Sequence, residues 1–471
     1  MDASTPQDAL CFAYLYGYPV YAYAQYVKTI ADAKPNVAYP FRNLATPDNR
    51  AVVRPNVDTL YTPLFYDVSQ VDLEFVIPEI EDRYWLWPWY DLFGNNFANI
   101  GSLQGFKPGR YLLRYTEDNF GVQTKGFEGG YLAYVNSPTP YGMLLNRILV
   151  KYRTPEDLAK VHSIQDSMVF TPVSRPTGPH KELPPLDLPA MLATINDSTP
   201  ETLATSILTL LATLHPHNPS IVYSDREAIT RTLILAGLSF KSDKKETFNQ
   251  PENTSLVHAV SIAESLAATS RQSPGLSEKM GNSWTQPAAA VSGDFGSRYA
   301  ARMFSAQRGY LILTRDQAAY PAYTLPGKAS GSDRFAISRD EAYILTFTTG
   351  PPRVKESGFW SLTIYGADQF LIPNERRVYN LGDRSGLVDL HGKALALAHD
   401  TRAEGEERQV FKILIQAADV RPPEERVRNW LPAPAGGGVF MISFRFYGAC
   451  QEMFDGGWVY PVVEKVGAVR G

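Results

Sequence analysis

The hydrophobic periodicity of the chain changes twice along its 471 residues, and this change constrains the fold more than any other feature of the sequence. From about 36 to 152, and again from about 320 to the end, apolar and polar residues alternate in short runs separated by glycine and proline, which is typical of β-strands. The segment between them, 153–313, carries helix signals. The pattern therefore predicts a mainly β protein with a helical insert. The clearest expected strands are 58–67, 75–78, 83–92, 110–116, 342–348, 359–365, 393–398, 409–415 and 439–447.

Helix start signals recur in the middle segment. A threonine followed by proline and an acidic residue, as in 154–157 (TPED) and 199–201 (TPE), places an N-cap before a proline at the first helical position. The apolar stretch 9–24 predicts an earlier buried helix, kinked at Pro19. With a prior of about 150 residues per domain, we expect three domains. Their expected ranges are 1–152 for a helix plus β-sandwich, 153–313 for a mostly helical middle domain and 314–471 for a second β domain. Further expected helices are 199–215, 224–237, 254–271 and 295–313.

One expected strand has aromatic residues on both faces. In residues 84–90 (YWLWPWY), a period of two places three tryptophans on one face and Tyr84 and Tyr90 on the other. Both faces must therefore be covered by protein, or one of them lines a cavity. Pro88 cannot donate a hydrogen bond to a neighbouring strand, which predicts an edge strand or a bulge.

The composition excludes several classes of protein. Its 45 basic and 49 acidic residues give a net charge of −4, without the basic surplus that binds nucleic acid. The two cysteines, Cys11 and Cys450, exclude a disulfide framework and a four-cysteine zinc site. Residues 9–24 are too short for a membrane span and lack the basic segment of a signal peptide, so we expect a cytoplasmic protein.

Common cofactor motifs are absent from the sequence. It contains no Walker A loop, no G-x-G-x-x-G after a strand, no G-x-S-x-G, no H-E-x-x-H and no C-x-x-C. We therefore expect no metal, nucleotide or other cofactor. His215 and His217 have a metal-like spacing, but they follow an expected helix, where histidine favours the helix dipole. A site of two histidines and one carboxylate elsewhere stays open.

Polar and aromatic residues concentrate in three clusters, which resemble the motifs of a known family. Their segments are 53–61 (VRPNVDTLY), 82–85 (DRYW) and 91–97 (DLFGNNF); 358–365 (GFWSLTIY) and 374–379 (NERRVY); and 429–434 (NWLPAP), 444–447 (FRFY) and 457–458 (GW). The first cluster resembles the N-terminal domain of proteins that carry two domains of unknown function, DUF1254 and DUF1214, and the other two resemble the C-terminal domain. The resemblance implies an immunoglobulin-like β-sandwich, a helical middle domain and a C-terminal jelly roll. It implies little about function. Bacterial members often carry export signals, and their absence here argues against an envelope role.

The first cluster supplies most of the candidate site residues. Asp58 offers a general acid or base, and Tyr61 and Asn96 offer hydrogen-bond donors, so these three are the candidate catalytic residues. The candidate substrate-binding residues are Arg54, Asn56, Tyr84, Trp360 and Arg445.

Each of these residues also has a structural interpretation. Asn56 suits an Asx turn with an Arg54–Asp58 ion pair beside it, and Asn96 suits a turn that begins at Asp91. Trp360 suits a core. A buried Arg445 needs a partner, for which Asp333 and Glu341 are candidates.

Aromatic faces without a cofactor motif are compatible with a pocket for a small, largely apolar molecule. We hypothesise a cofactor-independent enzyme of specialised metabolism that catalyses isomerisation, cyclisation (pericyclic chemistry included) or elimination. The alternatives are a hydrolase or metal-assisted lyase, and a non-catalytic carbohydrate- or lipid-binding sandwich. We expect a small-molecule substrate and no nucleic-acid or membrane partner, and a homo-oligomer stays open. If the first cluster is not the site, the boundary near Arg302, Tyr323 and Arg445 is the next candidate.

Overall fold

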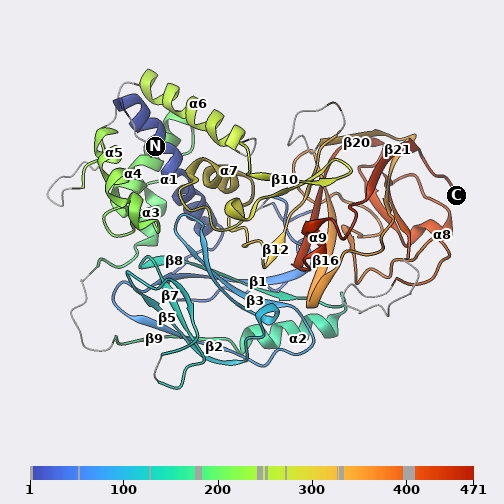
Figure 1. Cartoon of the computed structure of the whole chain (residues 1–471), viewed down its shortest axis with the longest axis horizontal. Coiled ribbons are helices and arrows are strands. Elements are labelled where there is room, and N and C mark those ends of the chain that lie inside the picture. The colour runs from blue at the N-terminus through green and yellow to red at the C-terminus, as the bar shows by residue number, and fades with distance from the viewer. Residues whose placement is uncertain are drawn as a thin grey trace.

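The protein is mainly β, with a helical region between two β regions, as the sequence predicts. Figure 1 shows the three groups of elements: helices at upper left, N-terminal strands below them and C-terminal strands at right. The computed structural model describes residues 4–50, 53–126, 129–175, 183–240, 248–249, 253–270, 273–325, 327, 334–395 and 409–471.

The N-terminal β region contains two sheets that pack face to face around one core. The strand order of the first sheet is β1 (Thr59–Asp67), β8 (Tyr141–Leu149), β3 (Trp85–Asp91) and β4 (Asn96–Gly101). The order of the second is β6 (Gly121–Gln123), β7 (Tyr134–Ser137), β5 (Gly109–Tyr115), β2 (Asp72–Ile77) and β9 (Val169–Val173).

Strand β3 divides its aromatic residues between two faces, as the alternation predicts. Trp85, Trp87 and Trp89 are buried in the core between the two sheets. There Trp89 packs against Phe75 of β2, with ring centroids 4.9 Å apart. Tyr84, just before the strand, and Tyr90 lie on the opposite face, in the core shared with the helices. Both faces of β3 are therefore covered by protein.

Pro88 produces a bulge but not an edge strand. Strand β3 lies between β8 and β4, and its register with β4 shifts between Trp89 and Tyr90. On the other side, pairing with β8 skips from Leu86 to Trp89. The gap in this ladder accommodates the missing N–H of proline, and so an interior strand tolerates Pro88.

The helical region is built around the first helix. Helix α1 (Pro6–Lys28) extends beyond the expected 9–24 and contacts the helices that follow in the chain. Gly17 permits a close approach to α4, since a Cβ atom there would lie 3.1 Å from the side chains of Ile207 and Leu211. The other helices of the group are α3 (Leu188–Ala193), α4 (Pro200–Leu214), α5 (Arg226–Leu235), α6 (Asn253–Thr269) and α7 (Tyr299–Gly309).

Some elements pack across the expected domain boundary at residue 152. Helix α1 belongs to the helical group, although it precedes the N-terminal sheets in the chain. Helix α2 (Pro155–Asp166) and β9 instead join the N-terminal sheets, because β9 pairs with β2 and Val161 of α2 is buried in the core there. The expected helix at 295–313 is shorter than predicted, since α7 ends at Gly309.

The C-terminal region contains two larger sheets and a small one that begins in the middle segment. The first has the order β12 (Ala318–Ala319), β20 (Gly437–Ala449), β16 (Val354–Gly366) and β17 (Asn380–Gly382), with β14 (Arg334–Ser338) also paired to β20. The second has the order β19 (Trp430–Ala433), β18 (Phe411–Ala417), β15 (Glu341–Phe347) and β21 (Val462–Gly467). The small sheet consists of β10 (Ser277–Gly281), β11 (Trp284–Pro287) and β13 (Ala322–Tyr323).

Most of the expected C-terminal strands are present within a few residues of their predicted bounds. The exception is 393–398. Of these residues, Ala394 forms only an isolated bridge with Val388, and 396–398 lie outside the described residues. Two short helices, α8 (Glu424–Val427) and α9 (Glu452–Asp455), join strands. None of the helices in the described parts of the chain combines the length and apolarity needed to cross a membrane.

Candidate functional site

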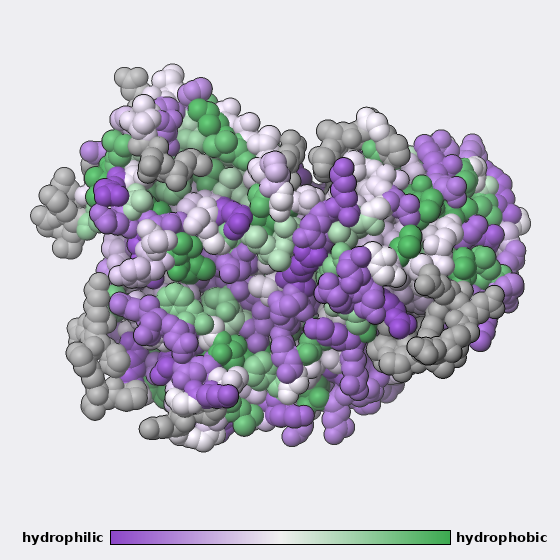
Figure 2. Space-filling model, in the orientation of Figure 1, coloured by the Kyte–Doolittle hydropathy of each residue, from purple (hydrophilic) through white to green (hydrophobic). Residues whose placement is uncertain are grey.

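Tyrosine and arginine side chains gather where the N-terminal sheets, the helical region and the C-terminal sheets meet. We call this group the tyrosine–arginine cluster, and its members are Tyr61, Tyr84, Tyr90, Arg147, Tyr320, Arg445 and Tyr447. The strand register explains part of the assembly, because Tyr61 of β1 is paired with Arg147 of β8. Strands β1, β3, β12 and β16 converge in the centre of Figure 1, and hydrophilic residues run down the centre of the same face in Figure 2.

Arg147 is buried in this cluster, where its side chain bonds to a phenol and to a main-chain carbonyl. Its side chain donates hydrogen bonds to the Tyr90 hydroxyl and to the carbonyl of Leu311, each 3.1 Å long. Its guanidinium carbon lies 5.6 Å from the ring centroid of Tyr61. The Nε atom is buried and has no hydrogen-bond partner. Among the described residues, no carboxylate forms an ion pair with Arg147.

Arg445, on β20, is likewise buried and donates to neutral acceptors. It donates to the hydroxyl of Thr363 at 3.3 Å and to the carbonyl of Arg54 at 3.0 Å. The expected pairing with Glu341 is wrong, because Glu341 lies on the far sheet and pairs with Lys465 at 2.9 Å. The other expected partner, Asp333, lies outside the described residues.

Tyr84 carries a buried hydroxyl that is not hydrogen-bonded. Its residue is 0% exposed, and its hydroxyl has no hydrogen-bond partner. The ring packs against Phe359 and Tyr447, with centroids 5.3 and 5.4 Å away. Burial raises the pKa of Tyr84 well above its usual value, so the phenol keeps its proton at neutral pH.

Asn56 joins the cluster from the segment before β1. Its side-chain oxygen accepts from the main-chain N–H groups of Asp58 and Thr59, which is the Asx turn that the sequence suggested. Its side-chain nitrogen donates to the Tyr447 hydroxyl at 2.7 Å. Because this hydroxyl already accepts from Asn56, the Tyr447 proton is directed elsewhere.

Asp58 lies beside the cluster, in a separate polar group. The expected Arg54–Asp58 pair is wrong: one Asp58 oxygen accepts from Arg384 at 2.7 Å and from Asn380 at 2.8 Å, and its other oxygen is buried without a partner. The Arg384 guanidinium lies 4.6 Å from the centroid of the Phe359 ring, on which Tyr447 stacks at 4.3 Å. Phe359 therefore lies between the Arg384 guanidinium and the Tyr447 ring.

Arg54 has other contacts. Its side chain donates to Gln369 at 3.2 Å and contacts the Met441 sulfur at 3.2 Å. Its carbonyl is the acceptor for Arg445, and its φ of 50° places it in the left-handed region. Arg54 thus supports the cluster mainly through its backbone.

Two candidate residues lie away from the cluster. Asn96 donates to the carbonyls of Trp89 and Ala98 and accepts from Asn99 and Thr314, so its side chain holds the start of β4 in place. Trp360 is 0% exposed in the core between the two C-terminal sheets. Its neighbour Phe359 faces the cluster, and alternation along β16 therefore points Trp360 away from it.

The next candidate boundary does not form one site either. Arg302 lies among the rings of Tyr16, Phe93 and Tyr299, at 4.6–4.9 Å from their centroids. Tyr323 instead stacks on Phe335 in the C-terminal core.

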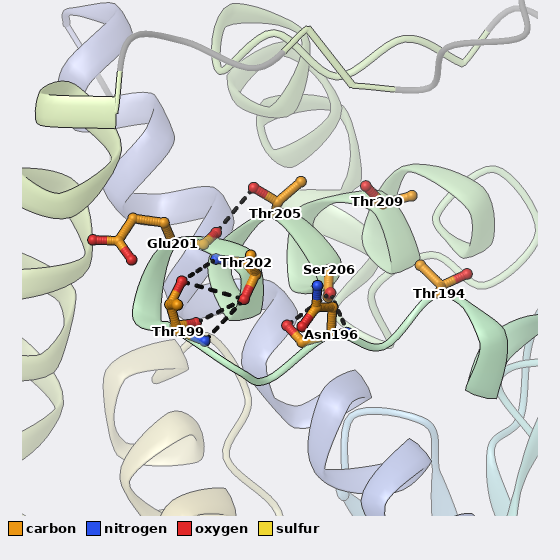
Figure 3. Close-up of a pocket in the computed structure, with 8 residues that line it drawn as sticks. All are labelled: Thr194, Asn196, Thr199, Glu201, Thr202, Thr205, Ser206 and Thr209. Atoms are coloured by element: carbon orange, nitrogen blue, oxygen red, sulfur yellow. Dashed lines mark hydrogen bonds between the residues drawn. The ribbon is translucent and has the colours of Figure 1, made fainter.

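A groove of about 490 Å³ on the helical region is the largest hollow that we describe, but its polar groups are already used. Figure 3 shows Thr199 and Thr202 bonded to each other in the cap of α4, and Thr205 bonded to the Glu201 carbonyl. Ser206 similarly accepts from the Asn196 main chain. These side chains stabilise the local structure, so we do not regard the groove as the functional site.

Metal ligands are not gathered in the described part of the chain. No group of three or more histidine, cysteine, aspartate or glutamate side chains there is arranged to hold a metal ion. His215 caps the end of α4 and shares a hydrogen bond of 2.9 Å with Thr230, and burial lowers its pKa to about 4.

Sequence reasoning missed Arg147, Tyr90 and Tyr320. Arg147 had a detectable signal, because it is the one charged residue in the mostly apolar strand 141–149 (YGMLLNRIL). A charge in such a strand must be solvated by something specific. Tyr320 had no signal, since it reaches the cluster only through the fold.

Comparison with known proteins agrees with the motifs. Residues 35–172 match the family model described as protein of unknown function (DUF1254), and residues 324–451 match protein of unknown function (DUF1214). No curated protein matches the chain.

One solved structure shows a similar fold. The crystal structure of the VPA0106 protein from Vibrio parahaemolyticus matches with a TM-score of 0.61 and 18% identity, over 98% of this chain and 100% of that chain. A putative uncharacterized protein from Burkholderia cenocepacia matches with a TM-score of 0.43 and 13% identity, over 98% and 89%. The two family models cover the segments that carry the motifs, in the same order, and the chain belongs to the family of proteins that combine a DUF1254 and a DUF1214 domain.

Proposed function

We propose that this protein is a cofactor-independent enzyme of specialised metabolism that isomerises, cyclises or eliminates a small, largely apolar organic substrate. The observation that carries the proposal is the Tyr84 hydroxyl, which is fully buried, has no partner and lies among other phenols and a guanidinium. An unsatisfied buried hydroxyl costs about 1–3 kcal/mol. A donor placed to meet a substrate oxygen accounts for that cost.

The chemistry of the cluster suits the stabilisation of negative charge on a substrate oxygen. Tyr84 keeps its proton and acts as the hydrogen-bond donor or general acid. Arg147 supplies positive charge next to it, in surroundings with little water. Tyr447, whose own proton is directed away from Asn56, supplies a second donor. Such a set favours an enol-like transition state, as isomerisation and elimination require.

The candidate residues predicted from the sequence have different roles in this proposal. Tyr61 and Arg445 lie in the cluster and contact the substrate. Asn56 positions Tyr447, and Asp58 positions the neighbouring Arg384, so both act through other residues. Asn96 and Trp360 are not part of the proposed site.

The finer architecture and the location belong to the same proposal. From the family resemblance, we propose that the paired N-terminal sheets are an immunoglobulin-like sandwich and that the C-terminal sheets are a jelly roll. We also propose a cytoplasmic protein whose partner is a small molecule rather than nucleic acid or membrane. A homo-oligomer remains compatible with this proposal.

The second candidate function is ligand binding without catalysis. The close packing of the cluster favours it, because the aromatic rings contact one another and enclose the polar groups. The two candidates differ in one respect: only the enzyme needs the Tyr84 proton.

The test compares Tyr84→Phe with the wild type and with Tyr66→Phe. Tyr66 is a buried tyrosine on the other face of the same sheet, so its variant serves as a matched control. Each purified protein is incubated with a metabolite extract of the organism that encodes it, and products are followed by mass spectrometry.

We expect a product in the wild type and in Tyr66→Phe, and a turnover about 10²–10⁴-fold lower in Tyr84→Phe. Equal turnover in Tyr84→Phe and the wild type would contradict the role of Tyr84. Binding of an extract component without any product would favour the non-catalytic alternative.

A further inference from the structure

The two arginines of the cluster differ from most buried arginines of this protein. Several arginines whose side chains are largely buried lie against a carboxylate, as in the pairs Arg83–Asp157 at 2.9 Å and Arg175–Asp72 at 3.1 Å. Arg384 similarly has both Asp58 and Asp383 as partners. Arg302, outside the cluster and 1% exposed, is an exception, because among the described residues no carboxylate forms an ion pair with it and its guanidinium lies among three aromatic rings.

Arg147 and Arg445 have no such compensation from the part of the chain that the structure describes. They are 4% and 6% exposed, and no carboxylate of the described residues pairs with either. Burial of one uncompensated charge costs several kcal/mol, even after relaxation of the surroundings. Both charges lie near the same phenols, Tyr61 and Tyr447, so the cost is concentrated in one place.

The tyrosines do not neutralise these charges. Burial raises the pKa values of Tyr84, Tyr90 and Tyr447, so all three remain neutral phenols at neutral pH. They offer hydrogen-bond donors and ring faces, which an anion with an apolar body can use. The cluster thus presents two cations, several donors and aromatic walls.

We infer that the cluster binds an organic carboxylate, which supplies the missing negative charge. The inference rests on the proposed function and names the substrate class for that site. The planar guanidinium fork matches a carboxylate, with two parallel N–H groups that meet its two oxygens. Binding exchanges the contacts of Arg147 and Arg445 with the carbonyls of Leu311 and Arg54 for contacts with the ligand. The rings of Tyr84 and Phe359 receive its apolar part.

Arginine-to-methionine variants separate this inference from a structural role. In Arg147→Met, the Leu311 carbonyl still accepts from the Tyr90 hydroxyl at 3.0 Å, so the substitution leaves that acceptor paired. Methionine fills a similar length without charge. The control is Arg302→Met, which removes another buried arginine, outside the cluster and surrounded by three aromatic rings.

The probes are benzoate and 3-phenylpropanoate, with benzamide and 3-phenylpropanamide as neutral counterparts and inorganic phosphate as a third arm. Binding is measured by calorimetry and by the shift in melting temperature. We expect both carboxylates to bind the wild type and Arg302→Met, the amides to bind at least tenfold more weakly, and carboxylate affinity to fall at least tenfold in Arg147→Met and Arg445→Met. Without a probe, Arg147→Met should melt no lower than the wild type.

Three outcomes overturn the inference: no carboxylate bound by the wild type, equal binding of acid and amide, or unchanged carboxylate affinity in Arg147→Met. Binding of phosphate alone overturns the carboxylate class as well. The proposed function fails separately, because it depends on the turnover of Tyr84→Phe. If turnover depends on Tyr84 while no carboxylate binds, the enzyme stands and only the anion is excluded.

Discussion

The two faces of one sheet, β1-β8-β3, show two different uses of aromatic residues. On one face, Trp85, Trp87 and Trp89 pack against the second N-terminal sheet in a continuous apolar core. On the other, Tyr84 and Tyr90 lie beside Arg147, opposite the helices and the C-terminal sheet. Because successive side chains of a β-strand point to opposite faces, the short segment 84–90 supplies the aromatic residues of both faces.

The difference between the faces lies in charge. The tryptophan face also holds buried donors without partners, the indole N–H groups of Trp87 and Trp89, but these are neutral. The tyrosine face holds the full positive charge of Arg147, with which no carboxylate of the described residues forms an ion pair. Burial of a neutral group without a hydrogen bond has a modest free-energy cost that packing can offset. Burial of an unpaired charge costs much more, and a bound anion would reduce that cost. The comparison therefore favours a structural role for the tryptophan face and places the proposed function on the tyrosine face.

The largest effect on stability is expected from Trp89→Ala on the tryptophan face. The residue is 0% exposed and packs against Tyr66 and Phe75, so truncation should cost about 3–5 kcal/mol of unfolding free energy. Chemical denaturation measures the loss. Activity per folded molecule should survive, and its disappearance at full folding would show that the two faces are not separable.

A pH-dependent difference is expected from Asp91, at the end of β3. Burial raises its pKa to about 6, above the value of about 3.8 for the unfolded chain. Between pH 4 and 6 the folded protein holds a proton that the unfolded chain has lost, so the contribution of Asp91 is fully present below pH 4 and is lost as the pH rises to 6. The loss is about 3 kcal/mol for a shift of about two pKa units.

The variant Asp91→Asn should remove this dependence. Asp91 accepts from Asn95, whose own side-chain oxygen has no partner, so a flipped Asn95 amide can pair with the new asparagine. Stability of the variant relative to the wild type should therefore rise as the pH is raised from 4 to 6. His215 has the opposite effect, because its pKa of about 4 makes the protein more stable as the pH rises through the same range. Since both proteins contain His215, its contribution cancels when their stabilities are subtracted. A constant difference would contradict the assignment.

A smaller effect is expected from Asp58→Asn. The asparagine oxygen can still accept from Asn380, and Arg384 keeps Asp383, so the loss should be about 1–3 kcal/mol. Turnover per folded molecule should remain within a few-fold of the wild type, since the Asp58 side chain bonds to Arg384 and Asn380, outside the tyrosine–arginine cluster. A fall of about 10²–10⁴-fold without a change in stability would instead make Asp58 a general acid or base.

The sequence predicted the mainly β fold with its helical insert, and it predicted the two faces of β3. Local signals sufficed there, because proline, threonine caps and alternation act within a few residues. It also brought Tyr61, Tyr84 and Arg445 into the candidate set. It misjudged Arg54 and Asp58, since the partner of Asp58 is Arg384, more than 300 residues away in the chain. It could not find Tyr320, whose position depends on the packing of three regions.

The smallest expected effect comes from a matched pair on the tyrosine face. Tyr84→Phe removes a buried hydroxyl that makes no hydrogen bond, so its unfolding free energy should be no lower than that of the wild type and should rise by about 1 kcal/mol, the lower end of the cost of an unsatisfied hydroxyl. Tyr90→Phe removes a hydroxyl that donates to the Leu311 carbonyl and accepts from Arg147, which should cost about 1 kcal/mol. Denaturation of both variants under the same conditions measures the difference. Two equal losses would mean that Tyr84 has a partner in the folded protein, and the argument from its unsatisfied hydroxyl would then fail. Undiminished stability together with lost turnover would favour a role of the Tyr84 hydroxyl in the reaction over a role in folding.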